Sequence, residues 1–166
     1  MNNKTTKKNG ISKLIWIAAA VVVIFGLIIF LTNQSNKSKM ADNPYDKENL
    51  NQATIDQLDD KNYQNIALPD EVNKQIESGE PTTVYFFSPL CEHCQTTTPV
   101  LMPVAEDMDV DVLQYNLLEY EQGWDDYFIE GTPTLIHFED GKEVARWVGA
   151  QPKENIEEFF DQVVLK

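Results

Sequence analysis

One uninterrupted apolar segment limits the possible structures of this chain more than any other feature. Residues Leu14 to Leu31 carry no charged side chain and are predominantly aliphatic or aromatic. As an α-helix, a segment of this length spans about 27 Å, which is enough to cross the hydrocarbon core of a bilayer once. We therefore expect residues 14–31 to form a single transmembrane anchor, with the rest of the chain folding beside the membrane.

The lysines that flank this segment predict its orientation. Four lysines precede the segment, whereas only Lys37 and Lys39 follow it closely. The positive-inside rule then keeps residues 1–13 in the cytoplasm and places the remainder outside the cell membrane. A cleaved signal peptide is the alternative, but the apolar segment is long and residues 32–40 offer no small-x-small cleavage site. We expect an uncleaved signal-anchor.

The charge of the chain changes sharply after the apolar segment. Residues 1–40 contain six lysines and no acidic residue, so residues 41–166 hold 7 basic and 27 acidic residues, a net charge of −20. This charge disfavours nucleic acid as a partner, and it favours solubility or attraction to cationic partners. With 166 residues, the chain has room for one ordinary domain besides the anchor.

Residues 32–166 divide into a polar linker and a region in which helices and strands alternate. Residues 32–62 are rich in Asn, Ser, Lys and Asp, and we interpret them as a linker with a possible short helix at 51–60. The alternation beyond residue 62 predicts an α/β domain. Its expected elements are strand 63–68, helix 69–79, strand 82–88, a helix from Cys91, strands 110–116, 134–138 and 143–148, and a closing helix after Pro152.

Both cysteines of the chain lie in one tetrapeptide, Cys91-Glu92-His93-Cys94. The strand expected just before it is apolar on both alternating faces, which is typical of a strand covered by structure on both sides. Apolar positions after it recur at helical spacing, so Cys91 is expected at a helix N-cap with Cys94 in the first turn. A helix N-terminus lowers the pKa of a thiol, and the pattern therefore indicates a reactive dithiol.

A metal site is the competing interpretation of two cysteines and two histidines. His93 lies between the cysteines and His137 lies on an expected strand, so four ligands are not expected to converge in a tetrahedron. We predict no metal and no bound cofactor. Outside the membrane, a dithiol lies where disulfides persist.

Several motifs in residues 63–166 together resemble the thioredoxin superfamily. The dithiol stands at the family's Cys-x-x-Cys, and Pro99 stands at its helix-kinking proline. The later matches are Gly131-Thr132-Pro133-Thr134, similar to the loop with a cis-proline opposite the dithiol, Gly141 in the hairpin turn, and Gly149 after the last strand.

This resemblance implies a thioredoxin fold, in which helices flank a mixed central β-sheet. It also implies that Cys91, Cys94 and His93 are catalytic. Thr132 and Pro133 would bind an extended substrate by β-strand addition.

Departures from the family pattern bear on the direction of the reaction. The resemblance places Tyr85 and Gln114 where thioredoxins carry a buried acid and a lysine, which disfavours general reductase activity. His93 before the second cysteine is similar to bacterial disulfide oxidases and to disulfide isomerases. An imidazole there would stabilise the Cys91 thiolate and make the disulfide more oxidising, whereas Glu92 acts in the opposite sense.

Together with the expected anchor, the resemblance implies a membrane-tethered thiol-disulfide oxidoreductase acting on the thiols and disulfides of secreted or cell-surface proteins, with oxidase or isomerase direction favoured. A separate redox partner would recycle the dithiol. Three alternatives stay open: an extracytoplasmic reductase, an accessory protein for export of disulfide-containing peptides such as bacteriocins, and a redox-inert module that binds peptides.

Overall fold

The computed structural model describes residues 6–166, with side chains from residue 13 onward. Residues 1–5 of the expected cytoplasmic segment lie outside the described residues. The chain divides into a helical unit that ends at Ala41 and a compact unit from Asp42 to Lys166.

The helical unit is one long helix, α1 (Thr6–Met40). From Lys13 to Met40 it is long and apolar enough to cross a membrane, judged by length and composition. The side chains of residues 14–31 are exposed along this whole stretch. A helix that is apolar all round needs either protein or lipid around it, which fits the anchor expected at 14–31.

Residues 32–62, expected as a linker, are structured. The first part continues α1, and the rest belongs to the compact unit that begins at Asp42. Two short helices form there, α2 (Gln52–Gln57) and the 3₁₀ helix η1 (Lys61–Tyr63), and the first of them confirms the short helix expected at 51–60.

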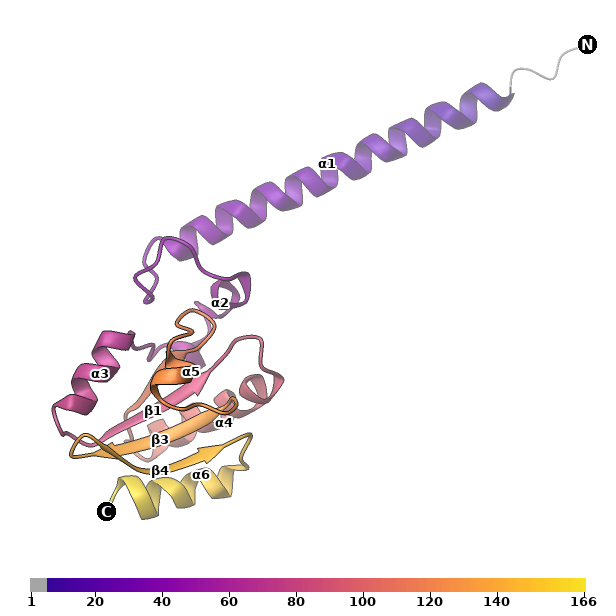
Figure 1. The fold of residues 1–166 in the computed structure, drawn as a ribbon. Helices are drawn as coiled ribbons and strands as arrows, with labels where there is room; N and C mark the ends of the chain where they lie inside the picture. The colour runs from indigo at the N-terminus through magenta and orange to yellow at the C-terminus, as the bar shows by residue number, and fades with distance from the viewer. Residues whose placement is uncertain (1–5) are drawn as a thin grey trace, which may run out of the picture. The chain divides into compact units, whose positions relative to one another are not determined.

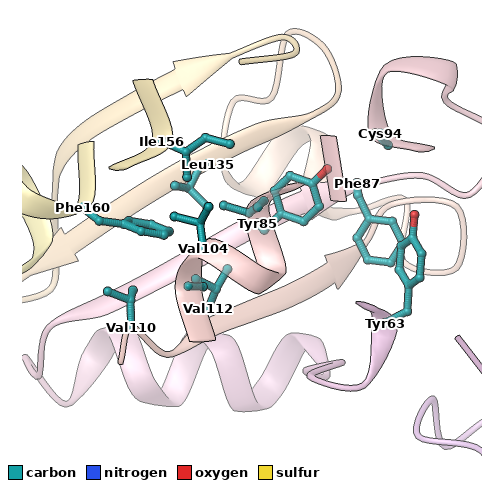
Figure 2. Close-up of a cluster of buried hydrophobic side chains, with 12 residues drawn as sticks. Tyr63, Tyr85, Phe87, Cys94, Val104, Val110, Val112, Leu135, Ile156 and Phe160 are labelled. Carbon is teal, nitrogen blue, oxygen red and sulfur yellow. The ribbon is translucent and has the colours of Figure 1, made fainter. Parts of the chain in front are cut away.

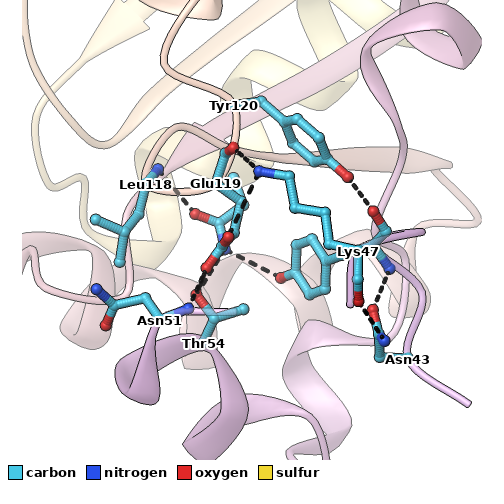
Figure 3. A network of polar contacts seen from close by, with 9 residues as sticks. Asn43, Lys47, Asn51, Thr54, Leu118, Glu119 and Tyr120 are labelled. Atoms are coloured by element: carbon cyan, nitrogen blue, oxygen red, sulfur yellow. Dashed lines mark hydrogen bonds and ion pairs between the residues drawn. The ribbon is translucent and has the colours of Figure 1, made fainter. Parts of the chain in front are cut away.

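A buried carboxylate explains why so polar a segment folds onto the domain (Figure 3). Glu119, in the loop after the second strand, accepts hydrogen bonds from the Asn51 amide at 2.9 Å and from Thr54 Oγ1 at 2.7 Å. Lys47 Nζ lies 3.6 Å from the same carboxylate and 4.4 Å from the centre of the Tyr120 ring. Polar side chains that predict a solvated linker thus bond to specific distant partners.

The compact unit is built on a mixed sheet of four strands in the described part of the chain (Figure 1). The strands run in the order β2-β1-β3-β4, with β1 parallel to β2 and the other neighbouring pairs antiparallel. Their bounds are β1 (Thr82–Phe87), β2 (Val112–Asn116), β3 (Thr134–Glu139) and β4 (Lys142–Val148). All four confirm strands expected from the sequence.

Helices cover both faces of this sheet. The face under α4 (Glu92–Asp107) and α6 (Lys153–Phe159) is called the α4 face here, and α6 continues as a π-helical turn, η2 (Phe160–Val164). The opposite face, called the α3 face, lies under α3 (Pro69–Glu77) and α5 (Gly123–Asp126). Helices flanking a mixed sheet confirm the expected fold class.

Side chains alternate between the two faces along β1, as a pleated strand requires. Tyr85 and Phe87 enter the core of the α4 face, drawn in Figure 2, whereas Val84 and Phe86 enter the core of the α3 face. All four are fully buried. The continuous apolar run in the sequence therefore reflects burial on both sides.

The prediction of a strand at residues 63–68 is wrong, because only one parallel bridge forms there, between Ile66 and Gln114. Side-chain amides take up hydrogen bonds that a longer ladder would have used. Gln114 accepts from the Asn65 amide at 3.1 Å and donates to the Asn62 carbonyl at 2.8 Å, while Asn65 Nδ2 donates to the Val112 carbonyl at 2.7 Å.

Candidate active site

The turn between β1 and α4 brings both cysteines to the carboxyl end of a central strand. Cys91 is the N-cap of α4, and its sulfur accepts a hydrogen bond from the Cys94 amide at 3.3 Å. The Cys91 amide donates to the Ser88 carbonyl at 3.1 Å, which closes the turn. Cys94 lies in the first helical turn, as the spacing predicted, and both cysteines are free thiols.

The environment of Cys91 favours its thiolate. Partial burial of the sulfur acts to raise the pKa of this thiol. Hydrogen bonds with the Thr132 side chain, with the Cys94 thiol and with the backbone amides of residues 93 and 94 outweigh burial, so the pKa of Cys91 is below its ordinary value. Of the two thiols, the half-buried Cys91 therefore loses its proton more readily.

Cys94 has the opposite environment. It is fully buried in the core of the α4 face. Burial, and next the hydrogen bond with the Cys91 sulfur, raise the pKa of Cys94 to about 12. Cys94 is thus a protonated thiol at neutral pH.

The loop before β3 lies against the first cysteine. The Thr132-Pro133 peptide bond is cis, and the Cys91 thiol donates a hydrogen bond to the Thr132 carbonyl at 3.2 Å. Thr134 Oγ1 donates to the Gly131 carbonyl at 2.7 Å, and the Gly149 amide donates to the Pro133 carbonyl at 2.8 Å. The structure therefore brings together the two parts of the site that the sequence suggested, Cys91 and the Thr132-Pro133 loop.

His93 and Glu92 lie in the same helical turn, but their side chains are exposed. Neither side chain makes a hydrogen bond or ion pair within the described part of the chain. His93 takes part through its backbone, because its amide helps lower the pKa of Cys91 and its carbonyl accepts from Thr96 Oγ1 at 3.0 Å. An electrostatic role for the His93 imidazole stays a prediction.

Tyr85 stands where thioredoxins carry a buried acid, and it supplies a hydroxyl there in place of a carboxylate. Tyr85 is fully buried, and its hydroxyl lies 3.0 Å from Thr98 Oγ1. Thr98 in turn donates to the Cys94 carbonyl at 2.8 Å. Sequence reasoning missed Thr98, although its spacing of four residues from Cys94 was a usable signal, since a helical Thr often bonds the carbonyl four residues earlier.

A large apolar side chain is exposed beside the dithiol. Leu90, next to Cys91, is 62% exposed despite its size. Trp124 packs partly buried against the core of the α3 face.

Comparison with known proteins gives consistent matches. The family model described as thioredoxin matches residues 63–162, which include the dithiol and the Thr132-Pro133 loop. Thioredoxin from Staphylococcus epidermidis is 37% identical over 94 residues, covering 55% of this chain and 89% of that protein, and thioredoxin from Staphylococcus aureus is 35% identical over the same length. Among solved structures, a mutant thioredoxin from Halobacterium salinarum has a TM-score of 0.51 and 25% identity, covering 57% of this chain and 84% of that one.

Proposed function

The chain belongs to the thioredoxin family, and from that premise we propose that it is a membrane-tethered thiol-disulfide oxidoreductase. It acts on secreted or cell-surface proteins through Cys91 and Cys94, in the oxidase or isomerase direction. The observation that carries this proposal is the placement of the two thiols: the half-buried Cys91 sulfur caps α4 and accepts from the Cys94 amide at 3.3 Å, whereas Cys94 is fully buried. This placement lowers the pKa of Cys91 and raises that of Cys94.

In the oxidising direction the reaction has two steps. A substrate thiolate attacks the Cys91 sulfur, the Cys91–Cys94 bond breaks, and its electron pair passes to Cys94, which takes up a proton. A second substrate thiolate then attacks the substrate sulfur of the mixed disulfide, and Cys91 leaves as a thiolate. The substrate gains a disulfide and loses two electrons to the dithiol, which a separate oxidant must restore.

The preferred direction follows from the stability of the reduced form. A thiolate stabilised at Cys91 makes the reduced dithiol more stable and its disulfide a stronger oxidant. Tyr85 and Gln114, both buried and uncharged, add no carboxylate or ammonium beside Cys94. These features support disulfide donation over general reduction.

The location is proposed from α1. Its apolar stretch serves as the anchor, and the lysines on its N-terminal side keep residues 1–13 in the cytoplasm. The compact unit, with its dithiol, then faces the extracytoplasmic space, where protein thiols become oxidised.

Trapping of mixed disulfides tests the reaction in cells. Replacing Cys94 by Ser removes the second thiol, so full-length C94S should accumulate disulfide-linked partners through Cys91 on non-reducing gels. The matched control C91S/C94S should trap none. If C94S traps no partner when its expression equals that of the parent, the redox proposal fails and a peptide-binding module without redox activity gains support.

The reduction potential tests the direction. For the full-length protein equilibrated with glutathione buffers, we expect a potential well above the roughly −270 mV of thioredoxin. A value at or below that figure contradicts the oxidase preference. H93A should lower the potential if the imidazole stabilises the thiolate, and an unchanged potential would show that His93 acts through its backbone alone.

A further inference from the structure

Three hydroxyl groups gather beside the buried cysteine. Tyr85 and Thr98 form a hydrogen bond of 3.0 Å, and Thr98 Oγ1 donates to the Cys94 carbonyl at 2.8 Å. Since Thr98 uses its single proton on that carbonyl, the Tyr85 hydroxyl must be the donor to Thr98. The hydrogen bonds therefore run in one direction, from Tyr85 through Thr98 to Cys94.

Tyr63 brings the third hydroxyl from the N-terminal segment of the compact unit. Its ring centre lies 5.2 Å from that of Phe87, which stacks on Tyr85 at 5.9 Å with an interplanar angle of 6°. Figure 2 shows both tyrosine hydroxyls at the end of the core where Cys94 lies. Burial raises the pKa of Tyr63, and a hydrogen bond with Thr98 opposes that rise. Tyr63 therefore belongs to the same group of hydroxyls as Tyr85 and Thr98.

The tyrosine hydroxyls near Cys94 are neutral at neutral pH. Burial raises the pKa of Tyr85 and of Tyr63, and a nearby Cys94 thiolate would raise both further. Cys91 is the titratable group that acts on Cys94 from its own turn, and Asp60 acts on Tyr63 from the preceding turn. The hydroxyls are therefore hydrogen-bond donors rather than bases.

We propose that Tyr63 and Tyr85, through Thr98, are positioning residues for Cys94 when it resolves a mixed disulfide held on Cys91. They fix the first turn of α4 by its Cys94 carbonyl and present neutral dipoles to the sulfur on which negative charge develops. This inference rests on the proposed redox function and assigns the task of a buried carboxylate to uncharged hydroxyls.

The step concerned is written for an aromatic disulfide, 5,5′-dithiobis(2-nitrobenzoate). The Cys91 thiolate first attacks one of its sulfurs, forms a mixed disulfide and releases one aromatic thiolate. Cys94 then loses its proton to water and attacks the Cys91 sulfur. The Cys91–aryl disulfide bond breaks, a second aromatic thiolate leaves, and the Cys91–Cys94 disulfide remains.

The two released thiolates test two different claims. The first release tests the proposed redox function, and the second tests the positioning role of the hydroxyls. With reduced full-length protein in detergent micelles, the fast first release reports Cys91, and the second reports Cys94. We expect Y85F and Y63F each to slow the second release about tenfold, comparable to losing one hydrogen bond, while leaving the first unchanged. The pH profile of the second release should also move to higher pH. Because both tyrosines act through Thr98, the double variant should slow it by less than the product of the two effects.

Matched variants exclude a merely structural effect. Tyr115 is a buried tyrosine on the α3 face whose hydroxyl has no partner within the described residues, so Y115F should change neither release. T98V should slow the second release, and T98S, which keeps the hydroxyl, should restore it. A second release that is unaffected in Y85F, Y63F and T98V would overturn the positioning role. Absence of a first release would instead overturn the proposed function.

Discussion

The two faces of the central sheet are equally well buried but use their aromatic residues differently. On the α4 face, Tyr85 bonds to Thr98, and Tyr63 shares the same core with Cys94. On the α3 face, Tyr127 donates to Asn73 at 2.6 Å, away from any thiol, and Tyr115 packs edge-on against Tyr127. One face places polar groups where chemistry can use them, and the other uses aromatic rings mainly for packing.

This difference shows that strand register decides function within a fully apolar run. Adjacent residues of β1 have the same burial, yet Phe86 contributes to one core and Phe87 to the core that contains Cys94. Moving the register by one residue would exchange the two sets of side chains. The comparison therefore predicts that mutations on the two faces will have similar effects on stability and different effects on thiol chemistry.

The largest effect should come from truncating one aromatic residue on either face. F86A and F87A each remove a fully buried ring and should lower the free energy of unfolding by about 3–5 kcal/mol. Only F87A should also change the release of thiolate attributed to Cys94, because Phe87 stacks between Tyr63 and Tyr85. Denaturant unfolding and the two-step assay on folded protein test this. Equal changes in the second release for both variants would contradict the predicted difference between the two faces.

A smaller effect is expected from the carboxylate that holds the N-terminal segment near the α3 face. E119A removes the acceptor of Asn51 and Thr54 and leaves Lys47 without its ion pair. Unfolding free energy should fall by about 2 kcal/mol, and amide hydrogen exchange should rise across residues 42–58.

E119Q is the matched control for the Glu119 variant. It keeps an acceptor oxygen and should lose less stability than E119A. The first release from Cys91 should be normal in both variants. Unchanged exchange across residues 42–58 in E119A would show that the carboxylate does not hold the segment.

Local rules account for the elements that the sequence predicted correctly. The helix that begins at Pro69, the N-cap at Cys91 and the hairpin turn at Asp140 and Gly141, with φ of 51° and 74°, depend on neighbouring residues alone. The short helix at 51–60 was also predicted, but the packing of residues 42–62 against the rest of the compact unit could not be predicted in this way. Lys47, Asn51 and Thr54 are held by Glu119, which lies 65 to 72 positions away, and amino-acid composition does not indicate such a partner.

The candidate site likewise contains residues that the sequence predicted and residues that it did not. Cys91, Cys94 and the Thr132-Pro133 loop are found from motif spacing and from resemblance. Tyr63 could not be found, because it is expected to begin a strand, whereas it ends the 3₁₀ helix η1 and its ring enters the core that contains Cys94. The exposed imidazole of His93 shows the converse, since a position in a motif does not determine where a side chain points.

The smallest effect concerns a buried histidine at the end of the sheet away from the dithiol. His137 Nδ1 lies 2.9 Å from Thr83 Oγ1, and Nε2 lies 3.4 Å from the Glu139 carboxylate. Burial lowers the pKa of His137 despite the opposing effect of Glu139. Below the unfolded pKa of about 6.5 the unfolded chain binds a proton that the folded chain binds less readily, so stability falls as pH decreases through this range.

H137Q, which can still bond to Thr83, should weaken that pH dependence, and E139Q should strengthen it. Unfolding free energies measured between about pH 7.5 and 5.5 test both variants. The same slope in parent and H137Q would assign the dependence to other groups.

The most direct test of the redox account is alkylation of the two cysteines resolved by pH. Reduced full-length protein is treated briefly with iodoacetamide between about pH 5 and 9, and each cysteine is quantified by mass spectrometry. The account predicts that Cys91 reacts at pH values below those of an ordinary thiol, because its pKa is lowered, while Cys94, with its pKa raised to about 12, stays unmodified. Joint modification of both cysteines with one midpoint near the ordinary value of about 8.5 would contradict it.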